Sequence, residues 1–366
     1  SSSLILNLHK AVSIVQWILV GNIILLIIQM ALWSSYSILS LVFVAYLSNF
    51  FTAGLLVVFA LRFFSWYRNG NHSLGILLYA LAFMILATAE VFAGIGSGYL
   101  LWQKDDIITP TSEVHFRSFP EGSLLDIFFS SYSYVDYSSF LLTLVASALL
   151  LYHYSKKART PKMIIIIVLP ILGYTATILD ALNIYDTDTN PNLFYYYIFQ
   201  SLASILGGVL FAFSFWFISK RLPESPVKTF LRIAALGFIL LYLSNHTDVN
   251  SATYPQYGIN SLSLLPLASY FVLFGLYSSA LSLSQDITLR QHLRSIAKND
   301  SNLLSSIGTA QMEREVNRAV GELKEVADEE EKELAEKTGI ETPVPESEIE
   351  DYLKQVIEEV AKTRKK

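Results

Sequence analysis

Eight long apolar runs constrain this 366-residue chain more than any other feature. A helix that crosses about 30 Å of hydrocarbon needs roughly 20 predominantly apolar residues, and its backbone groups must pair within the helix because lipid offers them no water. The sequence therefore predicts an all-α, polytopic transmembrane helix bundle with about eight spans. The main alternative is seven spans, with the first or the seventh run not fully crossing. The eight runs are 11–33, 39–67, 74–102, 125–154, 163–183, 193–219, 229–245 and 262–284.

Charged residues between these runs alternate in sign from one connection to the next. One set of connections is basic, with Glu224 as its one acidic residue, and contains Arg62, Arg68, Lys156, Lys157, Arg159, Lys162, Lys220, Arg221, Lys228 and Arg232. The other set is acidic and contains Asp105, Asp106, Glu113, Glu121, Asp126, Asp186, Asp188 and Asp248, with Lys104 and Arg117 as its basic residues. Basic connections stay in the cytoplasm. We therefore expect a multi-pass membrane protein with both termini in the cytoplasm.

The composition excludes several classes of function. The chain has no Cys, so disulfides, thiolate nucleophiles and Cys-ligated metals are excluded. Most of its acidic residues lie in the tail, and no basic patch suits a nucleic-acid partner. No Lys lies in the middle of a span, which excludes a retinal Schiff base. We predict a protein that is not an enzyme and that holds no cofactor.

The sequence predicts that the chain has four parts. They are the bundle at 1–284, a coiled-coil-like signalling helix at 285–338, a proline hinge at 339–346 and an amphipathic helix at 347–366. Apolar residues of the signalling helix recur three, four or seven positions apart, as in the seam of a coiled coil. This seam is predicted to bind a second copy of the chain or another protein, and it contains Leu289, Leu293, Ile296, Leu303 and Ile307.

The final helix has a narrow apolar stripe of Ile349, Leu353, Val356 and Val360. Ser347 and Glu350 form a capping box at its start. The stripe needs a covering surface. Two readings stay open: the helix folds back on residues 311–336, or it docks a partner protein.

Three carboxylates lie inside the predicted spans, namely Glu90, Asp136 and Asp180. Ionisable side chains are costly in lipid and suggest function by default. Together with Tyr99 and Trp102 they predict a binding site for a cationic ligand near the outer side, since aromatic rings attract cations. The competing interpretation is that each carboxylate is a protonated or hydrogen-bonded group in helix packing.

Two further patterns inside or beside the spans have simpler readings. Gly94 and Gly98 form a GxxxG face, which favours close helix packing over a phosphate loop. His115, His246 and Asp248 are weak candidates for a metal site on the outer side, because no three-His set with a carboxylate stands at helical spacing.

The junction from Gly275 to Arg294, GLYSSALSLSQDITLRQHLR, and the stretch from Leu303 to Val316, LLSSIGTAQMEREV, resemble a paralogous group of multi-span membrane proteins of ammonia-oxidising archaea. That group is similar to the membrane input halves of sensor kinases and has no established activity. The resemblance covers the last span and the first tail helix, and the other spans in general character. It implies an archaeal plasma membrane and a role in signal relay or assembly.

These observations favour a membrane sensor or receptor-like scaffold, in which an outer signal reaches the cytoplasmic tail through the last span. One alternative is a transporter or channel for a small cationic solute, which would need a polar path through both halves of the membrane. Another alternative is a structural subunit of a membrane complex.

Overall fold

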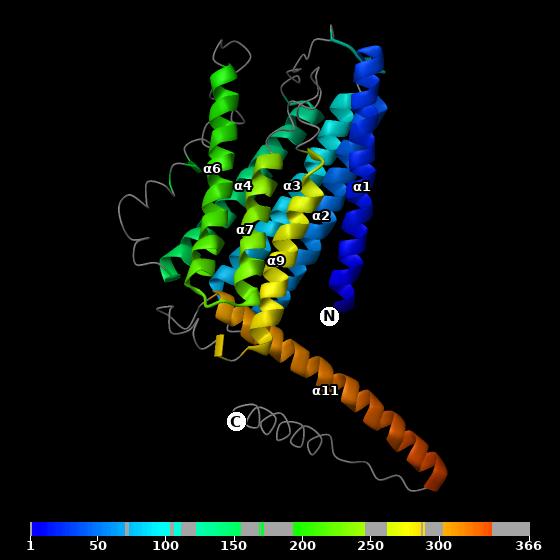
Figure 1. Ribbon diagram of the computed structural model, residues 1–366, viewed down its shortest axis with the longest axis vertical. Coiled ribbons are helices and arrows are strands. Elements are labelled where there is room, and N and C mark those ends of the chain that lie inside the picture. The colour runs from blue at the N-terminus through cyan, green and yellow to red at the C-terminus, as the bar shows by residue number, and fades with distance from the viewer. Residues whose placement is uncertain are drawn as a thin grey trace. The chain divides into compact units, whose positions relative to one another are not determined.

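The computed structural model describes residues 2–69, 73–102, 106–110, 122–154, 168, 170–171, 193–245, 262–286, 288–289 and 303–338. Its helices are α1 (Ser2–Trp33), α2 (Ile38–Asn69), α3 (Leu74–Trp102), α4 (Leu124–Tyr154), α6 (Leu193–Arg221), α7 (Pro226–Asn245), α9 (Leu265–Gln285) and α11 (Leu303–Thr338) (Figure 1). Two short strands, β1 (Tyr36–Ser37) and β2 (Ile107–Ile108), pair in antiparallel fashion. The chain divides into two compact units, Ser1–Ala310 and Gln311–Lys366.

Seven helices within the described residues are long and apolar enough to cross a membrane: α1, α2, α3, α4, α6, α7 and α9. They coincide with seven of the eight predicted spans, which confirms an all-α polytopic bundle. The predicted span 163–183 lies outside the described residues, apart from Val168, Pro170 and Ile171.

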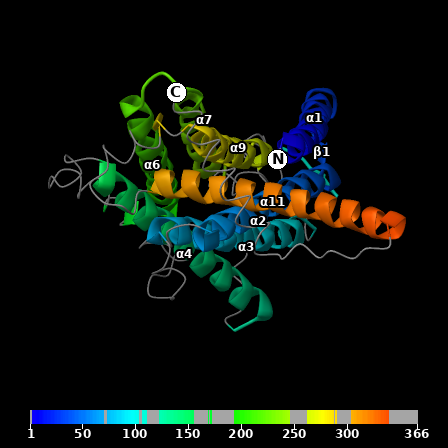
Figure 2. The ribbon, with the colours of Figure 1, turned by 90° about the horizontal axis from the view of Figure 1, so that it is seen from below.

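The spans of the first unit form two rows when viewed along the helices (Figure 2). One row is α2, α3 and α4, and the other is α9, α7 and α6, with α2 packed on α9 and α4 packed on α6. Helix α1 packs on α9 and α2 beside these rows. Large apolar side chains of α1 point outward, since Trp17 is 74% and Leu32 68% exposed. Such a surface is suited to lipid, so the bundle contacts a bilayer.

Helices α4 and α6 run parallel to each other. The ring centroids of Phe140 on α4 and Phe211 on α6 are 5.5 Å apart. Further along both helices, the Ser214 hydroxyl donates a hydrogen bond to the Ser147 carbonyl. The end of α4 and the start of α6 therefore lie at opposite ends of the bundle.

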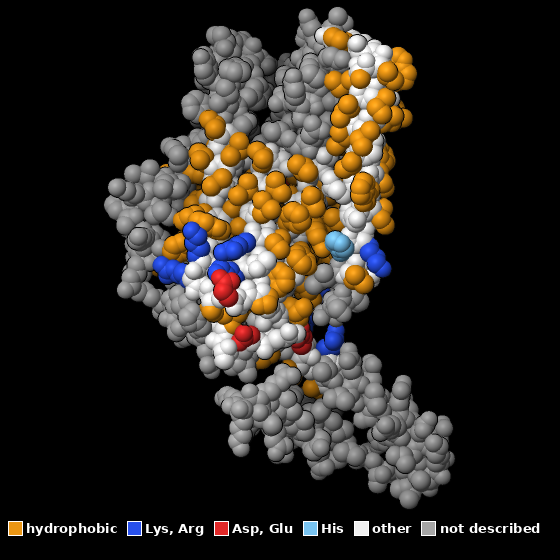
Figure 3. Space-filling view, in the orientation of Figure 1, with side chains coloured by type: hydrophobic (Ala, Val, Ile, Leu, Met, Phe, Trp, Pro, Cys, Tyr) orange, Lys and Arg blue, Asp and Glu red, His pale blue; other side chains and the backbone are white. Residues whose placement is uncertain are grey.

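The two ends of the bundle differ in charge. Arg68 lies in the last turn of α2, and Lys220 and Arg221 lie in the last turn of α6; we call this the basic end. Figure 3 shows Lys and Arg side chains gathered at the lower end of an otherwise apolar face. At the other end, the acidic end, the Asp106 carbonyl accepts a hydrogen bond from the backbone of Ile38, the first residue of α2. Arg68 is 30 residues further along this helix, or roughly 45 Å.

Glycines allow the closest helix contacts. A Cβ placed on Gly94 would lie 3.2 Å from Cβ of Asn49 on α2, which confirms the predicted packing face of Gly94 and Gly98. The tightest approach joins α7 and α9. A Cβ on Gly275 would lie 2.5 Å from the backbone nitrogen of Ala234, and one on Gly237 would lie 2.6 Å from that of Val272.

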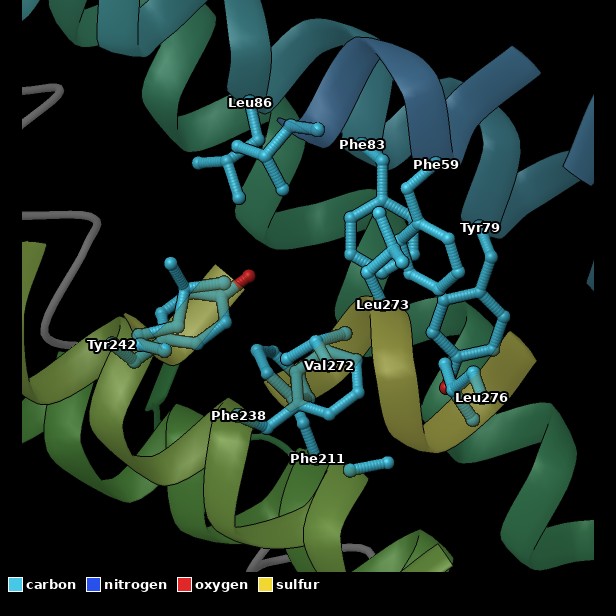
Figure 4. Close-up of a cluster of buried hydrophobic side chains, with 14 of the residues drawn as sticks. Phe59, Tyr79, Phe83, Leu86, Phe211, Phe238, Tyr242, Val272, Leu273 and Leu276 are labelled. Carbon is cyan, nitrogen blue, oxygen red and sulfur yellow. The ribbon is translucent and has the colours of Figure 1, made fainter. Parts of the chain in front are cut away.

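Aromatic rings fill the core on the basic side of the bundle (Figure 4). Ring centroids are 4.6 Å apart for Phe59 and Phe83, 5.9 Å for Tyr79 and Phe215, and 5.3 Å for Phe215 and Phe238. All of these rings are at most 1% exposed. We call the following set the aromatic belt: Phe59, Phe63, Tyr79, Phe83, Phe215 and Phe238.

Candidate functional site

Glu90 lies on the face of α3 that packs against α2. It is 1% exposed. Along α3 it lies between Phe83 and Gly94, which both contact α2. Glu90 is seven positions after Phe83 and four before Gly94, and these spacings keep all three on one helix face. The predicted intramembrane carboxylate is thus buried between two spans.

Helix α2 presents a polar turn to this face. Ser48, Asn49 and Thr52 fall within five residues of an otherwise apolar stretch, and each is at most 1% exposed. The antiparallel pairs Phe59–Phe83 and Asn49–Gly94 fix the register of α2 on α3. That register places Thr52 level with Glu90. Among the described residues, the side-chain polar atoms of Ser48, Asn49 and Thr52 have no hydrogen-bond partner.

Asp136 lies on α4, one turn before Phe140, whose ring centroid is 6.1 Å from that of Tyr242 on α7. Asp136 is half-buried. Both described carboxylates thus lie in the half of the bundle nearer the acidic end, and they come from different helices. Asp180 lies outside the described residues.

Tyr99 and Trp102 do not surround Glu90. Trp102 is 76% and Tyr99 is 38% exposed. They are twelve and nine residues beyond Glu90 on α3, or about 18 and 14 Å along the helix axis. Both rings lie near the acidic end of α3, where amphipathic rings suit the membrane–water interface. A shared site with Glu90 stays a prediction.

The polar turn of α2 and Glu90 together form what we call the polar layer. The aromatic belt lies next to this layer, on the side of the basic end. On α2 the belt follows the polar turn, and on α3 it precedes Glu90. Tyr79 also makes a hydrogen bond of 2.9 Å to the Ser147 hydroxyl, which fixes the belt to α4. Along α2 and α3, the rings of Phe59, Phe63 and Phe83 lie between Glu90 and the basic end.

Within the described residues, no three His, Cys, Asp or Glu side chains lie close enough together to hold a metal ion. The weak candidates His115, His246 and Asp248 all lie outside them. Their role stays a prediction.

The start of the predicted partner seam is buried in the first unit. Leu289, Leu303 and Ile307 are 4%, 6% and 2% exposed and belong to the same hydrophobic core as the spans. A Cβ placed on Gly75, near the start of α3, would lie 3.4 Å from Cδ1 of Leu303. The structure thus gives this seam an intrachain partner, and pairing with a second copy is not shown. Leu293, Ile296, Ile349, Leu353, Val356 and Val360 lie outside the described residues.

The boundary between the two units moves accordingly. The sequence predicts that the bundle ends at residue 284, whereas the first compact unit extends to Ala310. The first two turns of α11 belong to the bundle because their apolar side chains are buried in its core. The predicted parts 339–346 and 347–366 lie outside the described residues.

No family model, no curated protein and no solved structure matches this chain.

The polar turn of α2 is a feature that the ionisable residues of the sequence do not indicate. Ser, Asn and Thr are common in spans and carry no charge, so singly they signal little. Their spacing at positions 48, 49 and 52, on one side of a helix, is the signal that could have found them.

Proposed function

We propose that this chain is a non-enzymatic sensor or receptor-like scaffold in the plasma membrane of an archaeon, with its tail in the cytoplasm. An outer signal changes the packing of the bundle, and α9 with the first turns of α11 passes this change to the tail. The support comes from three features: an integral membrane bundle, a buried polar layer near its acidic end, and a tail helix that begins inside the core.

The burial of the start of α11 is the observation that carries this proposal. Leu303, Leu304, Ile307 and Ala310 are at most 6% exposed and lie in the core of the spans. Packed cores shift between discrete arrangements because they resist gradual deformation. A change in packing at the basic end therefore acts directly on the helix that leads into the second unit.

The test removes this connection. Leu303→Ala and Ile307→Ala should each destabilise the whole bundle by about 2–5 kcal/mol, because each deletes a buried apolar side chain. The matched control is Leu236→Ala on α7, whose side chain is 48% exposed on the lipid-facing surface. Unfolding of the full chain in lipid nanodiscs and hydrogen exchange at the start of α3 report the effect. If both variants behave like the control, the tail has no connection to the bundle and the relay is refuted.

The alternative function is a cationic-solute transporter. The buried polar layer supports this alternative, and the apolar aromatic belt beside the layer argues against it. Flux of a small cation into vesicles that contain the full chain would favour it. A structural subunit of a membrane complex is the other alternative, and stoichiometric copurification from native membranes would favour that one.

A further inference from the structure

The polar turn of α2 has hydrogen-bonding capacity that no described protein group uses. Asn49 offers an amide oxygen and an amide nitrogen, and it is 1% exposed; Thr52 is fully buried. Burying one such group without a partner costs roughly 1–3 kcal/mol. Ser48, one turn before Thr52, adds a third group of this kind. Three of them within one helical turn mark a place built for a polar occupant.

The register brings a carboxylate to the same place. Thr52 is level with Glu90, and Asn49 lies against Gly94, one turn further along α3. The carboxylate, the amide oxygen and the hydroxyls are all hard oxygen ligands, which suit hard metal cations. A carboxylate also binds a proton. One carboxylate supplies one negative charge, so a single positive charge neutralises the group.

The space between the helices limits the size of the occupant. Cβ of Asn49 would be 3.2 Å from a Cβ on Gly94, so α2 and α3 are in direct contact there. Such a direct contact leaves little room for an organic ammonium. We therefore consider a small inorganic cation or a proton in place of the amine that the sequence also allowed.

We propose that Glu90, Asn49 and Thr52, with Ser48 beside them, bind one small monovalent cation, either Na⁺ or a proton. Along α2 and α3, the aromatic belt lies between this site and the basic end. This inference concerns ion binding alone and does not depend on the proposed relay to the tail.

The experiment measures the thermal unfolding midpoint of the purified full chain in nanodiscs made of an uncharged lipid. NaCl is titrated against choline chloride at constant ionic strength, and the titration is repeated at several pH values. An ion that binds the folded state alone raises the midpoint as its concentration rises. Three variants are compared with the parent chain: Glu90→Gln, Asn49→Leu, and Glu224→Gln as a control outside the spans.

If Na⁺ is the ion, NaCl raises the midpoint of the parent chain and of Glu224→Gln. Glu90→Gln then abolishes the dependence, and Asn49→Leu weakens the apparent Na⁺ affinity at least about tenfold, because ligand charge and number set affinity. If a proton is the ion, the midpoint is insensitive to NaCl. A pH dependence above about pH 5, outside the range in which Glu224 titrates, is then present in the parent chain and in Glu224→Gln and is lost in Glu90→Gln. Both outcomes support the proposal.

The proposal is overturned if the parent chain shows neither dependence, or if Glu90→Gln retains the dependence of the parent. Should Glu90→Gln fail to fold, Asn49→Leu and Thr52→Val decide. Both keep the charge, and a Na⁺ or proton response identical to the parent chain in these two variants refutes the site. In that case the layer is a packing feature of the two helices.

Discussion

The contact between α7 and α9 predicts a large effect from one added methyl group. In Gly275→Ala, the new Cβ would lie 2.5 Å from the backbone nitrogen of Ala234 and 2.6 Å from the carbonyl oxygen of Phe230. Ordinary contacts begin near 3.4 Å. Both neighbouring atoms are backbone, so no side-chain rotation relieves the collision. The two helices must therefore separate by about 0.9 Å at this point.

The size of this separation sets the expected loss of unfolding free energy in Gly275→Ala. A radial gap of about 0.5–1 Å forfeits roughly a quarter to a half of the dispersion energy of each contact across it. Overpacking a tight core costs about 1–3 kcal/mol, and the rigid backbone on both sides puts Gly275→Ala at the upper end, near 3 kcal/mol. Gly237→Ala forces the same separation from the other helix. The double variant should cost clearly less than the sum of the two single variants, because one movement relieves both collisions.

The assay is reversible unfolding of the full chain in mixed micelles, followed by circular dichroism and tryptophan fluorescence. Gly54→Ala is the control, since nothing lies within 4 Å of the Cβ position of Gly54; it should leave stability unchanged or raise it by up to about 1 kcal/mol, because Ala has a higher helix propensity than Gly. If Gly275→Ala proves as stable as this control, the close approach of α7 and α9 is wrong. Strict additivity of the two core variants would refute the shared separation.

Three further predictions follow from other contacts. Tyr79→Phe removes the hydrogen bond to Ser147 and should destabilise the bundle by about 0.5–1 kcal/mol, as measured by the same unfolding assay; no change would show that the bond adds nothing in lipid. Because the chain has no Cys, Arg68→Cys and Asp106→Cys each give one reactive thiol; an impermeant maleimide should label them from opposite sides of sealed vesicles, and labelling from the same side would refute the topology. A hydrogen bond from the neighbouring lysine lowers the pKa of Glu224, so this carboxylate stabilises the fold above its unfolded-state pKa, and the effect is lost as the pH falls through the folded-state pKa. Since Glu224 is fully exposed, Glu224→Gln should remove only a small acid-side change in the unfolding midpoint between about pH 3 and pH 5, and a large loss of stability at neutral pH would contradict this reading.

The spans could be predicted from the sequence because lipid imposes one simple rule on it. A run must be apolar and about 20 residues long, and helix pairing of the backbone then follows. The segregation of Arg68 and Asp106 to opposite ends followed from the same reasoning. Both predictions depend on local composition, which a single sequence contains in full.

The packing of particular residues could not be predicted in this way. The spacing of Leu289, Leu303 and Ile307 is compatible with any apolar partner, and the structure supplies their own bundle as that partner. Glu90 was recognised by its charge, but its partners on α2 depend on the register between two helices. Likewise, Trp102 and Glu90 share a helix and yet lie about 18 Å apart.

The pairing of β1 with β2 sets an order of events during insertion into the membrane. Tyr36 and Ile108 belong to connections that flank α2 and α3, and they are joined in one antiparallel ladder. Both helices must have crossed the bilayer before these two segments can meet on the same side. The ribbon therefore closes only after α2 and α3 are both inserted, and from then on it ties the two ends of this pair of helices to each other.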